Sequence, residues 1–226
     1  MKTLALEFSS AERSVALLDT NASGNAECRA QVTEVGMTTA NTFKMIESAL
    51  GRTNWRREEI EQIAVGLGPG SFTGIRAAIA IAQGWALARD VKLQGVHSAE
   101  ALIQRARNEG MQGAAVIAID AQRGEFYAAR INPDSDVEKG TPALELVDAA
   151  QLQSWAEEGT TIMGPGIARK VEAARDLFPD ARQVGLLALS REDWIEGEKL
   201  EPIYLRETSF VKAPPPRTIP AAGEKK

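Results

Sequence analysis

The sequence predicts an α/β protein built from two related domains, because two features recur in the same order half a chain apart. The first is a short apolar strand that ends in an acid, followed by a polar turn and a second strand, as in a β-hairpin. It occurs in LALEFSSAERSVALL, residues 4–18, and in IAIDAQRGEFYAARI, residues 117–131. The second feature is an apolar strand that runs into Gly-Pro-Gly, at residues 63–70 and 160–166. We therefore expect two αβ units of common design.

Helical and strand patterns alternate between these repeated features. In the first half we expect a helix over 39–50 with Thr38 or Thr39 as cap and Gly51 as stop, a strand in EIEQIAVGLG, a helix over 72–88, a strand in VKLQGV, and a helix from Ser98 to Arg107 that Ser98 caps. In the second half, helical patterns lie near residues 149–158, 167–177 and 186–195. The domains are predicted at residues 1–108 and 109–207, and the proline-rich stretch 208–226 is predicted to be a disordered tail.

The composition is that of an ordinary globular protein. The 226 residues, 44% hydrophobic and 25% charged, are enough to form a core in one domain or in two small ones. The formal net charge of -5 provides no basic surface for a phosphate backbone, so a nucleic-acid role would need a partner that supplies positive charge. The sequence shows no signal peptide and no apolar run of about 20 residues, so we expect a cytoplasmic protein without a membrane span.

The single histidine, His97, and the single cysteine, Cys28, limit the chemistry. They exclude an intrachain disulfide and, within one chain, a metal site built from several His or Cys ligands. A Ser-His-Asp triad would have to use His97, and no G-x-S-x-G motif accompanies it. We expect His97 to be a partly buried histidine at the end of a strand.

The glycine-rich stretch GLGPGSFTGIRAAIAIAQG, residues 66–84, invites a comparison with phosphate-binding loops. It contains no lysine, which a Walker loop requires, and its third glycine is misplaced for a dinucleotide fingerprint. Two interpretations stay open: backbone amides at the helix start that bind an anion, or glycines that permit a tight turn and close helix packing.

The helix expected over 72–88 is apolar nearly all the way round. Ala80, Gly84 and Ala88 form a row of small residues, which lets a second helix approach closely. The helix over 39–50 also has an apolar arc too wide for one buried face. The alternatives are a fully buried central helix and a surface shared with another subunit.

Glu7 and Asp120 end the first strand of each hairpin. Acids at the carboxyl ends of strands can hold water on a magnesium ion in nucleotide sites. The alternative is that each acid only caps its own turn.

Several segments together resemble one family, that of TsaB (YeaZ). They are MKTLALEFSS, GPGSFTGIR with the helix and strand after it, GVHSAEAL, AIDAQRGEFY, and EPIYLR at 201–206, so the resemblance extends from residue 1 to about residue 207. It implies two ribonuclease-H-like domains of the actin/hexokinase/Hsp70 superfamily. It also implies a non-catalytic subunit of the bacterial machinery that attaches threonylcarbamoyl to N6 of adenosine 37 in tRNAs reading codons that start with A.

The partners that the resemblance implies are the catalytic relative TsaD, in a heterodimer, and the ATPase TsaE, with tRNA reached only through the complex. The chain is expected to pair with itself when alone, to need no cofactor and to hold no metal. In TsaD an H-x-x-x-H metal pair follows the glycine turn, helix and strand; here Ser98 and Leu102 stand at those two positions, so the transfer chemistry is not expected in this chain. The alternative is a nucleotide-binding ATPase or kinase-like enzyme of the same fold, while a metal-dependent peptidase is opposed by the ligand count.

The resemblance assigns two sets of residues. The family usually opens with Asp-Thr where Glu7-Phe8 stand, which leaves at most a vestigial nucleotide site at Glu7, Asp120, Gly164 and Gly166. The contact with TsaD, or with a second copy, is a four-helix bundle that uses the two apolar helices. Its expected residues are Thr42, Phe43, Met45, Ile46, Ala49, Phe72, Ile75, Arg76, Ile79, Ala80, Gln83 and Gly84.

Overall fold

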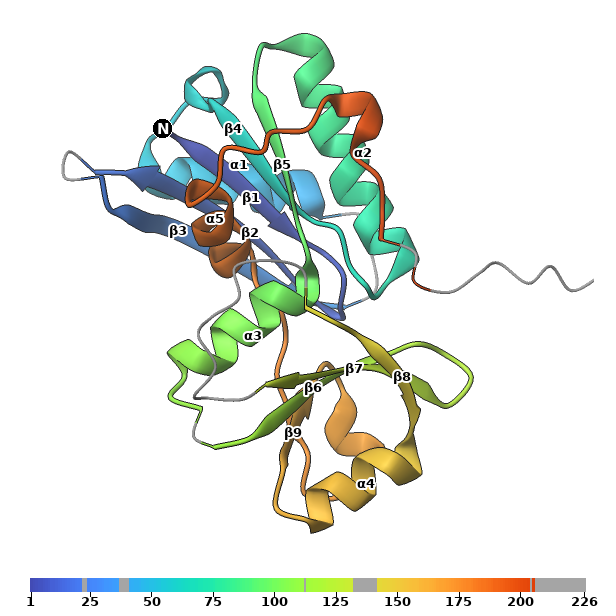
Figure 1. The fold of residues 1–226 in the computed structure, drawn as a ribbon. Helices are drawn as coiled ribbons and strands as arrows, with labels where there is room; N and C mark the ends of the chain where they lie inside the picture. The colour runs from blue at the N-terminus through green and yellow to red at the C-terminus, as the bar shows by residue number, and fades with distance from the viewer. Residues whose placement is uncertain (22–23, 37–40, 112, 132–141, 204, 206–226) are drawn as a thin grey trace, which may run out of the picture.

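The computed structural model describes residues 1–21, 24–36, 41–111, 113–131, 142–203 and 205. Figure 1 shows two lobes, each with its own sheet. The predicted tail over 208–226 and the predicted caps Thr38 and Thr39 lie outside the described residues.

The first sheet has five strands in the order β3-β2-β1-β4-β5. Strand β2 runs antiparallel to β1 and β3, whereas β1, β4 and β5 are parallel. The central strand β1 is buried along its whole length, which is why its sequence, TLALE, is nearly continuously apolar. The strands are β1 (Thr3–Glu7), β2 (Glu12–Thr20), β3 (Ala26–Val35), β4 (Gln62–Gly66) and β5 (Lys92–Val96).

The second sheet repeats this design. Its order is β10-β9-β6-β7-β8, and read from β8 it has the same succession of antiparallel and parallel pairs as the first sheet read from β3. The predicted pair of related, ribonuclease-H-like α/β domains is therefore confirmed. The strands are β6 (Ala115–Asp120), β7 (Glu125–Ile131), β8 (Glu145–Asp148), β9 (Thr161–Gly164) and β10 (Arg175–Asp176).

Helices cover both faces of the first sheet. Helices α1 (Thr42–Thr53) and α2 (Phe72–Ala88) pack on one face and α5 (Ala181–Leu189) on the other. Helix α3 (Ser98–Asn108) lies between the lobes, where it contacts α5 and strand β6, and α4 (Ala149–Glu157) covers the far side of the second sheet (Figure 1). Short 3₁₀ turns η1, η2 and η3 occupy Arg57–Glu59, Ile167–Arg169 and Gly197–Lys199.

The C-terminal part of the described chain returns to the first domain. Helix α5 places Ala181, Val184 and Ala188 against the first sheet, and Leu200 packs in the core beneath α2. The packing therefore differs from the predicted domain division, which places residues 181–203 in the second domain. The order of elements along the chain does not reveal this return to the first domain, because the return depends on which face of the first sheet is left uncovered by the other helices.

Several predicted element boundaries are wrong for identifiable reasons. Helix α1 runs through Gly51 and ends at Thr53, followed by the C-cap Asn54 in the left-handed conformation at φ 54°. The predicted helix over 167–177 is a 3₁₀ turn and strand β10, since pairing of Arg175 and Asp176 with β9 overrides helical propensity. The helix predicted over 186–195 begins earlier, because the side chain of Asp180 accepts a hydrogen bond from the Gln183 amide and caps α5.

Candidate functional site

The glycine-rich turn seats helix α2 directly on the chain that leaves β1. The amide of Ser71, the N-cap of α2, donates to the Ser9 carbonyl at 2.6 Å. Gly68 and Gly70 have φ of 94° and 147°, conformations that other residues rarely adopt. A Cβ at Gly70 would lie 2.1 Å from the Ser9 carbonyl oxygen. These contacts support the interpretation in which the glycines allow a tight turn and close packing.

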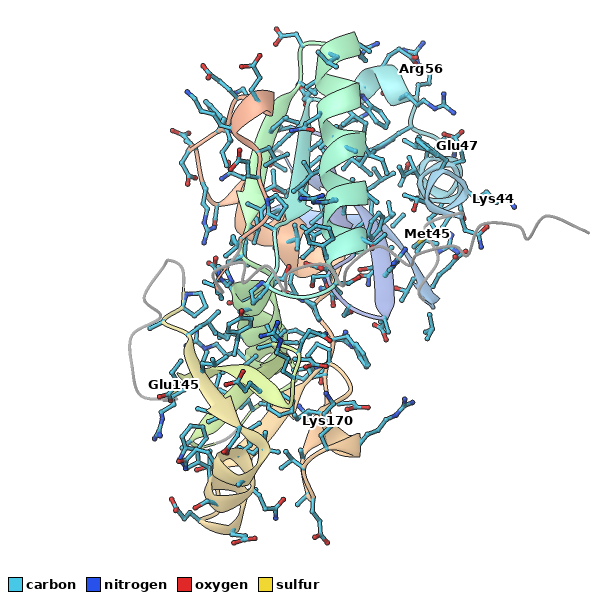
Figure 2. All side chains as sticks on the ribbon, turned by 90° about the vertical axis from the view of Figure 1, so that its right-hand side faces the viewer. Lys44, Met45, Glu47, Arg56, Glu145 and Lys170 are labelled. Carbon is cyan, nitrogen blue, oxygen red and sulfur yellow. The ribbon has the colours of Figure 1, made fainter. Side chains whose placement is uncertain are left out.

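An apolar groove lies between α1 and α2 on the side away from the sheet. Its volume is about 610 Å³. Figure 2 views α1 nearly end-on beside α2, in the lobe opposite the one that carries Lys170. The groove is lined by Phe43, Ile46, Glu47, Arg57, Glu58, Ala80, Ile81, Gly84, Trp85, Ala88 and Arg89.

The wall and rim of this groove differ in character. The apolar side chain of Phe43 is 68% exposed. The exposed residues Ala80 and Gly84, which also line the groove, have little or no side chain to fill it. At the rim, Arg57 pairs with Glu47 at 2.7 Å, and Arg89 donates to the Glu58 carbonyl at 3.1 Å. An apolar strip bordered by charged residues is typical of a protein-binding surface.

The structure divides the twelve predicted interface residues into two groups. Those that reach the surface or line the groove are Phe43, Ile46, Phe72, Arg76, Ala80 and Gly84. The others face inward: Thr42, Met45, Ala49, Ile75 and Ile79 are buried, and the Gln83 amide donates to the carbonyls of Gly197 and Leu200. Two residues of α2 that line the groove, Ile81 and Trp85, are absent from the predicted interface, whereas Ala88 belongs to the predicted row of small residues.

Glu7 is fully buried rather than open to a ligand. Its Oε1 accepts a hydrogen bond from the Ser9 amide at 2.7 Å, and its Oε2 accepts one from the Ser98 hydroxyl at 2.8 Å. A Cβ at Gly66 would lie 2.0 Å from Oε2, so the strand end closes over the carboxyl group. Burial is the main cause that raises the pKa of Glu7. Ser98, predicted to cap α3, directs its hydroxyl to Glu7 instead, and His97 is the N-cap residue.

Asp120 is the last residue of β6, the central strand of the second sheet, and is partly exposed. Its Oδ1 accepts a hydrogen bond from the Gln122 amide and its Oδ2 pairs with Lys170, each at 2.8 Å. Asp120 therefore caps its own turn and is neutralised by a lysine. A Cβ at Gly164 would lie 1.8 Å from the Ala118 carbonyl oxygen, and Gly166 has a φ of 67°.

A small cavity of about 170 Å³ includes one of the two acids, Asp120. Asp120 and Gln122 from the second domain line it together with Pro69 and Gly70 from the turn before α2, but Glu7 does not. The four residues of the predicted vestigial nucleotide site thus do not meet in one open site. Within the described residues no group of three or more His, Cys, Asp and Glu side chains is placed to hold a metal ion.

His97 is 4% exposed, and in the described part of the chain neither ring nitrogen has a hydrogen-bond partner. Burial lowers its pKa to about 4. A neutral, enclosed imidazole agrees with the predicted structural histidine. None of the helices in the described ranges is long and apolar enough to cross a membrane.

Comparisons with known proteins converge on one group. A family model described as "TsaD: tRNA N6-adenosine threonylcarbamoyltransferase" matches residues 38–157, more than half of the chain. The "tRNA threonylcarbamoyladenosine biosynthesis protein TsaB" of Escherichia coli (strain K12) is 29% identical over 74% of this chain and 80% of its own length. The Haemophilus influenzae protein of the same description is 33% identical over 57% of this chain and 52% of its own length.

Solved structures agree with these relatives. "YeaZ from Pseudomonas aeruginosa" is 28% identical with a TM-score of 0.69, covering 90% of this chain and 99% of that one. A second Pseudomonas aeruginosa structure, described as "an uncharacterized protein with similarity to peptidase YEAZ", is 27% identical with a TM-score of 0.70, covering 91% and 99%. The two-domain arrangement is therefore shared over nearly the whole described chain.

Proposed function

Since the chain belongs to the TsaB/YeaZ family, we propose that it takes part in tRNA threonylcarbamoyladenosine biosynthesis as a non-catalytic subunit that docks a TsaD-type catalytic subunit on its α1–α2 groove. In this role it holds the catalytic subunit in its active arrangement while threonylcarbamoyl is transferred to N6 of adenosine 37. The TsaE-type ATPase and the tRNA engage the resulting complex rather than the free chain.

The observation that carries this proposal is the groove itself. Phe43 projects at one wall, and Ala80 and Gly84 leave room for an approaching helix. Helices pack at interaxial distances of 8–10 Å, and small residues at the contact permit the shorter values. When the catalytic subunit is absent, a second copy of this chain would bind the same surface, because the apolar groove is exposed to water until some partner covers it.

The buried and paired acids support a non-catalytic role. Glu7 has no exposed surface, and its oxygens are engaged by Ser9 and Ser98. Asp120 is occupied by Lys170 and by the amide of its own turn. A group that binds magnesium through water needs open coordination, which the buried Glu7 does not offer; Asp120 is partly exposed but is paired with Lys170.

The test compares a groove variant with a matched variant elsewhere. Gly84→Arg adds a long charged side chain at an exposed position where a Cβ meets no atom within 4 Å, so folding is preserved and docking is blocked. Gln151→Arg adds the same side chain at an exposed position on α4, away from the groove. Titration calorimetry with the TsaD homologue from the same cell should show binding for the Gln151 variant and none for the Gly84 variant.

Modification in cells provides the second measurement. In cells that lack their own copy of this protein, wild type and Gln151→Arg should restore threonylcarbamoyladenosine in digested tRNA, and Gly84→Arg should not. Equal restoration by a folded Gly84→Arg would overturn the docking surface. Ile79→Glu is unsuitable as a groove variant, because Ile79 is only 5% exposed in the core and a charge there would unfold the protein.

A further inference from the structure

The buried carboxyl of Glu7 joins the first turn of α3 to the turn before α2. Ser98, the first residue of α3, donates its hydroxyl hydrogen to Glu7 Oε2 at 2.8 Å and accepts the Gly68 amide at 3.0 Å. The Ser98 amide in turn donates to the Gly68 carbonyl at 2.8 Å. Three hydrogen bonds therefore hold Ser98 between β1 and the glycine turn.

The connection continues from Glu7 to the cap of α2. Glu7 Oε1 accepts the Ser9 amide, and the Ser9 carbonyl accepts the amide of Ser71, the N-cap of α2. The Ser71 hydroxyl then accepts the Gly74 amide within the first turn of α2. An unbroken series of hydrogen bonds thus leads from the start of α3, through Glu7, to the start of α2.

The two helices at the ends of this series, α2 and α3, contact different parts of the molecule. Helix α2 forms one side of the docking groove. Helix α3 packs against β6 of the second domain and against α5, and the chain passes through it from the first domain to the second. A shift of the second domain that moves α3 would therefore act on Ser98 and, through Glu7, on the turn that seats α2.

The length of the Glu7 side chain matters to this connection. Its two oxygens reach an amide two residues away and a hydroxyl 91 residues away in sequence. Burying a carboxyl group is unfavourable unless hydrogen bonds compensate it, and here both oxygens receive donors. The side chain is thus kept in a buried position where it binds no exposed ligand but links the chain that leaves β1 to the first turn of α3.

We propose that Glu7 is a positioning residue that couples the second domain, through α3 and Ser98, to the docking helix α2, so that domain arrangement and partner binding are linked. The proposal rests on the proposed function only for the identity of the partner. The coupling itself is a property of the isolated chain. The proposed coupling also explains why an acid lies at position 7 although its carboxyl group is buried and faces no open binding site.

The test begins with Ser98→Ala, which removes both the hydroxyl that donates to Glu7 and the acceptor of the Gly68 amide. Hydrogen exchange of the amides of residues 71–75 should become at least tenfold faster, while exchange in α1, which receives no hydrogen bond from this series, stays unchanged. Affinity for the TsaD homologue should fall about tenfold, or about 1.4 kcal/mol in binding free energy. Glu7→Ala leaves the hydrogen bonds between Ser98 and Gly68 in place and so isolates the carboxyl group. It should produce the same pattern, and a Glu7→Ala protein that is folded by circular dichroism but exchanges at residues 71–75 like wild type would overturn the role of Glu7.

A conservative variant separates positioning from bulk stability. Glu7→Gln keeps an acceptor for the Ser9 amide and can donate from its Nε2 to the Ser98 hydroxyl, so its exchange and affinity should stay within twofold of wild type. As a stability control, Leu152→Ala in the core of the second domain lowers stability without touching the series. It should leave exchange at residues 71–75 unchanged relative to α1.

Three further outcomes decide the proposal. If Ser98→Ala leaves exchange at residues 71–75 unchanged, or if Leu152→Ala speeds it as much, the coupling is overturned. If exchange changes but affinity does not, the link to partner binding is overturned. If the wild-type chain does not bind the TsaD homologue at all, the proposed function fails, and the exchange measurements alone then support or overturn the coupling.

Discussion

Gly74 lies directly against the carbonyl oxygen of Phe8. A Cβ built at Gly74 would come within 1.9 Å of that oxygen, and the neighbouring atoms belong to backbone that cannot rotate away. The first turn of α2 is therefore held against the chain that leaves β1 with no space for a side chain. This contact sets where α2 begins relative to the sheet.

Gly74→Ala is expected to destabilise the protein by about 3 kcal/mol or more, because overpacking against backbone cannot be relieved by a rotamer change. The gain in helix propensity, at most about 1 kcal/mol, is too small to offset it. Urea unfolding followed by circular dichroism measures the difference. Gly84→Ala is the matched control in the same helix: nothing lies within 4 Å of its Cβ, so it should stabilise by about 0.5–1 kcal/mol. If Gly74→Ala and Gly84→Ala change the free energy of unfolding in the same direction, the close packing of α2 against the Phe8 carbonyl is contradicted.

The sequence was sufficient to predict the elements whose signal is local. The hairpins whose first strands end at Glu7 and Asp120, and helix α2 with its apolar surface, depend on patterns within a few residues. The repeat also predicts that the two halves share one design, and the two sheets have the same succession of strand pairs.

What could not be predicted depends on contacts between distant segments. Helical spacing shows that α2 is apolar on several sides but not which side meets the sheet, so buried Ile79 and exposed Gly84 were predicted for the same surface. The hydroxyl of Ser98 could cap α3 or bind another group, and only the approach of β1 decides in favour of Glu7. Strand β10 forms because its backbone pairs with the edge of β9, and this pairing outweighs the local helical pattern.

Phe43 should matter for docking and hardly for folding. It is 68% exposed at the wall of the groove, so Phe43→Ser is expected to change the free energy of unfolding by no more than about 0.5 kcal/mol. An aromatic residue buried by a partner can contribute about 2 kcal/mol, so affinity for the TsaD homologue should fall roughly thirtyfold. Leu87→Ser is the control, because Leu87 is 90% exposed on α2 and does not line the groove. Equal losses of affinity in the two variants would argue for a docking surface other than the groove.

Asp120→Asn distinguishes a capping acid from a catalytic one. Asparagine keeps an oxygen that accepts the Gln122 amide, and only the pair with Lys170 is lost. Since both partners are more than a third exposed, the change in stability should stay below about 1 kcal/mol. Threonylcarbamoyladenosine in tRNA should be restored as by wild type. ATP hydrolysis by the wild-type chain that the substitution abolishes would instead favour the ATPase or kinase-like alternative.

His97 should make stability depend on pH in the acidic range. Burial lowers its pKa to about 4, against about 6.5 in an unfolded chain, so the folded protein holds the imidazole neutral where the unfolded chain takes up a proton. Stability is therefore complete above about pH 6.5 and declines as the pH falls toward 4, with a slope of at most about 1.4 kcal/mol per pH unit.

Because His97 is the only histidine, its imidazole resonance gives the folded-state midpoint directly by nuclear magnetic resonance. His97→Leu provides the comparison: the difference in unfolding free energy between the two proteins should be constant above pH 7 and change in favour of the variant below pH 6.5. The raised pKa of Glu7 acts in the opposite direction but is common to both proteins, so it cancels in this difference. A difference that stays constant from pH 7 to pH 4, or a resonance midpoint near 6.5, would show that His97 is not enclosed.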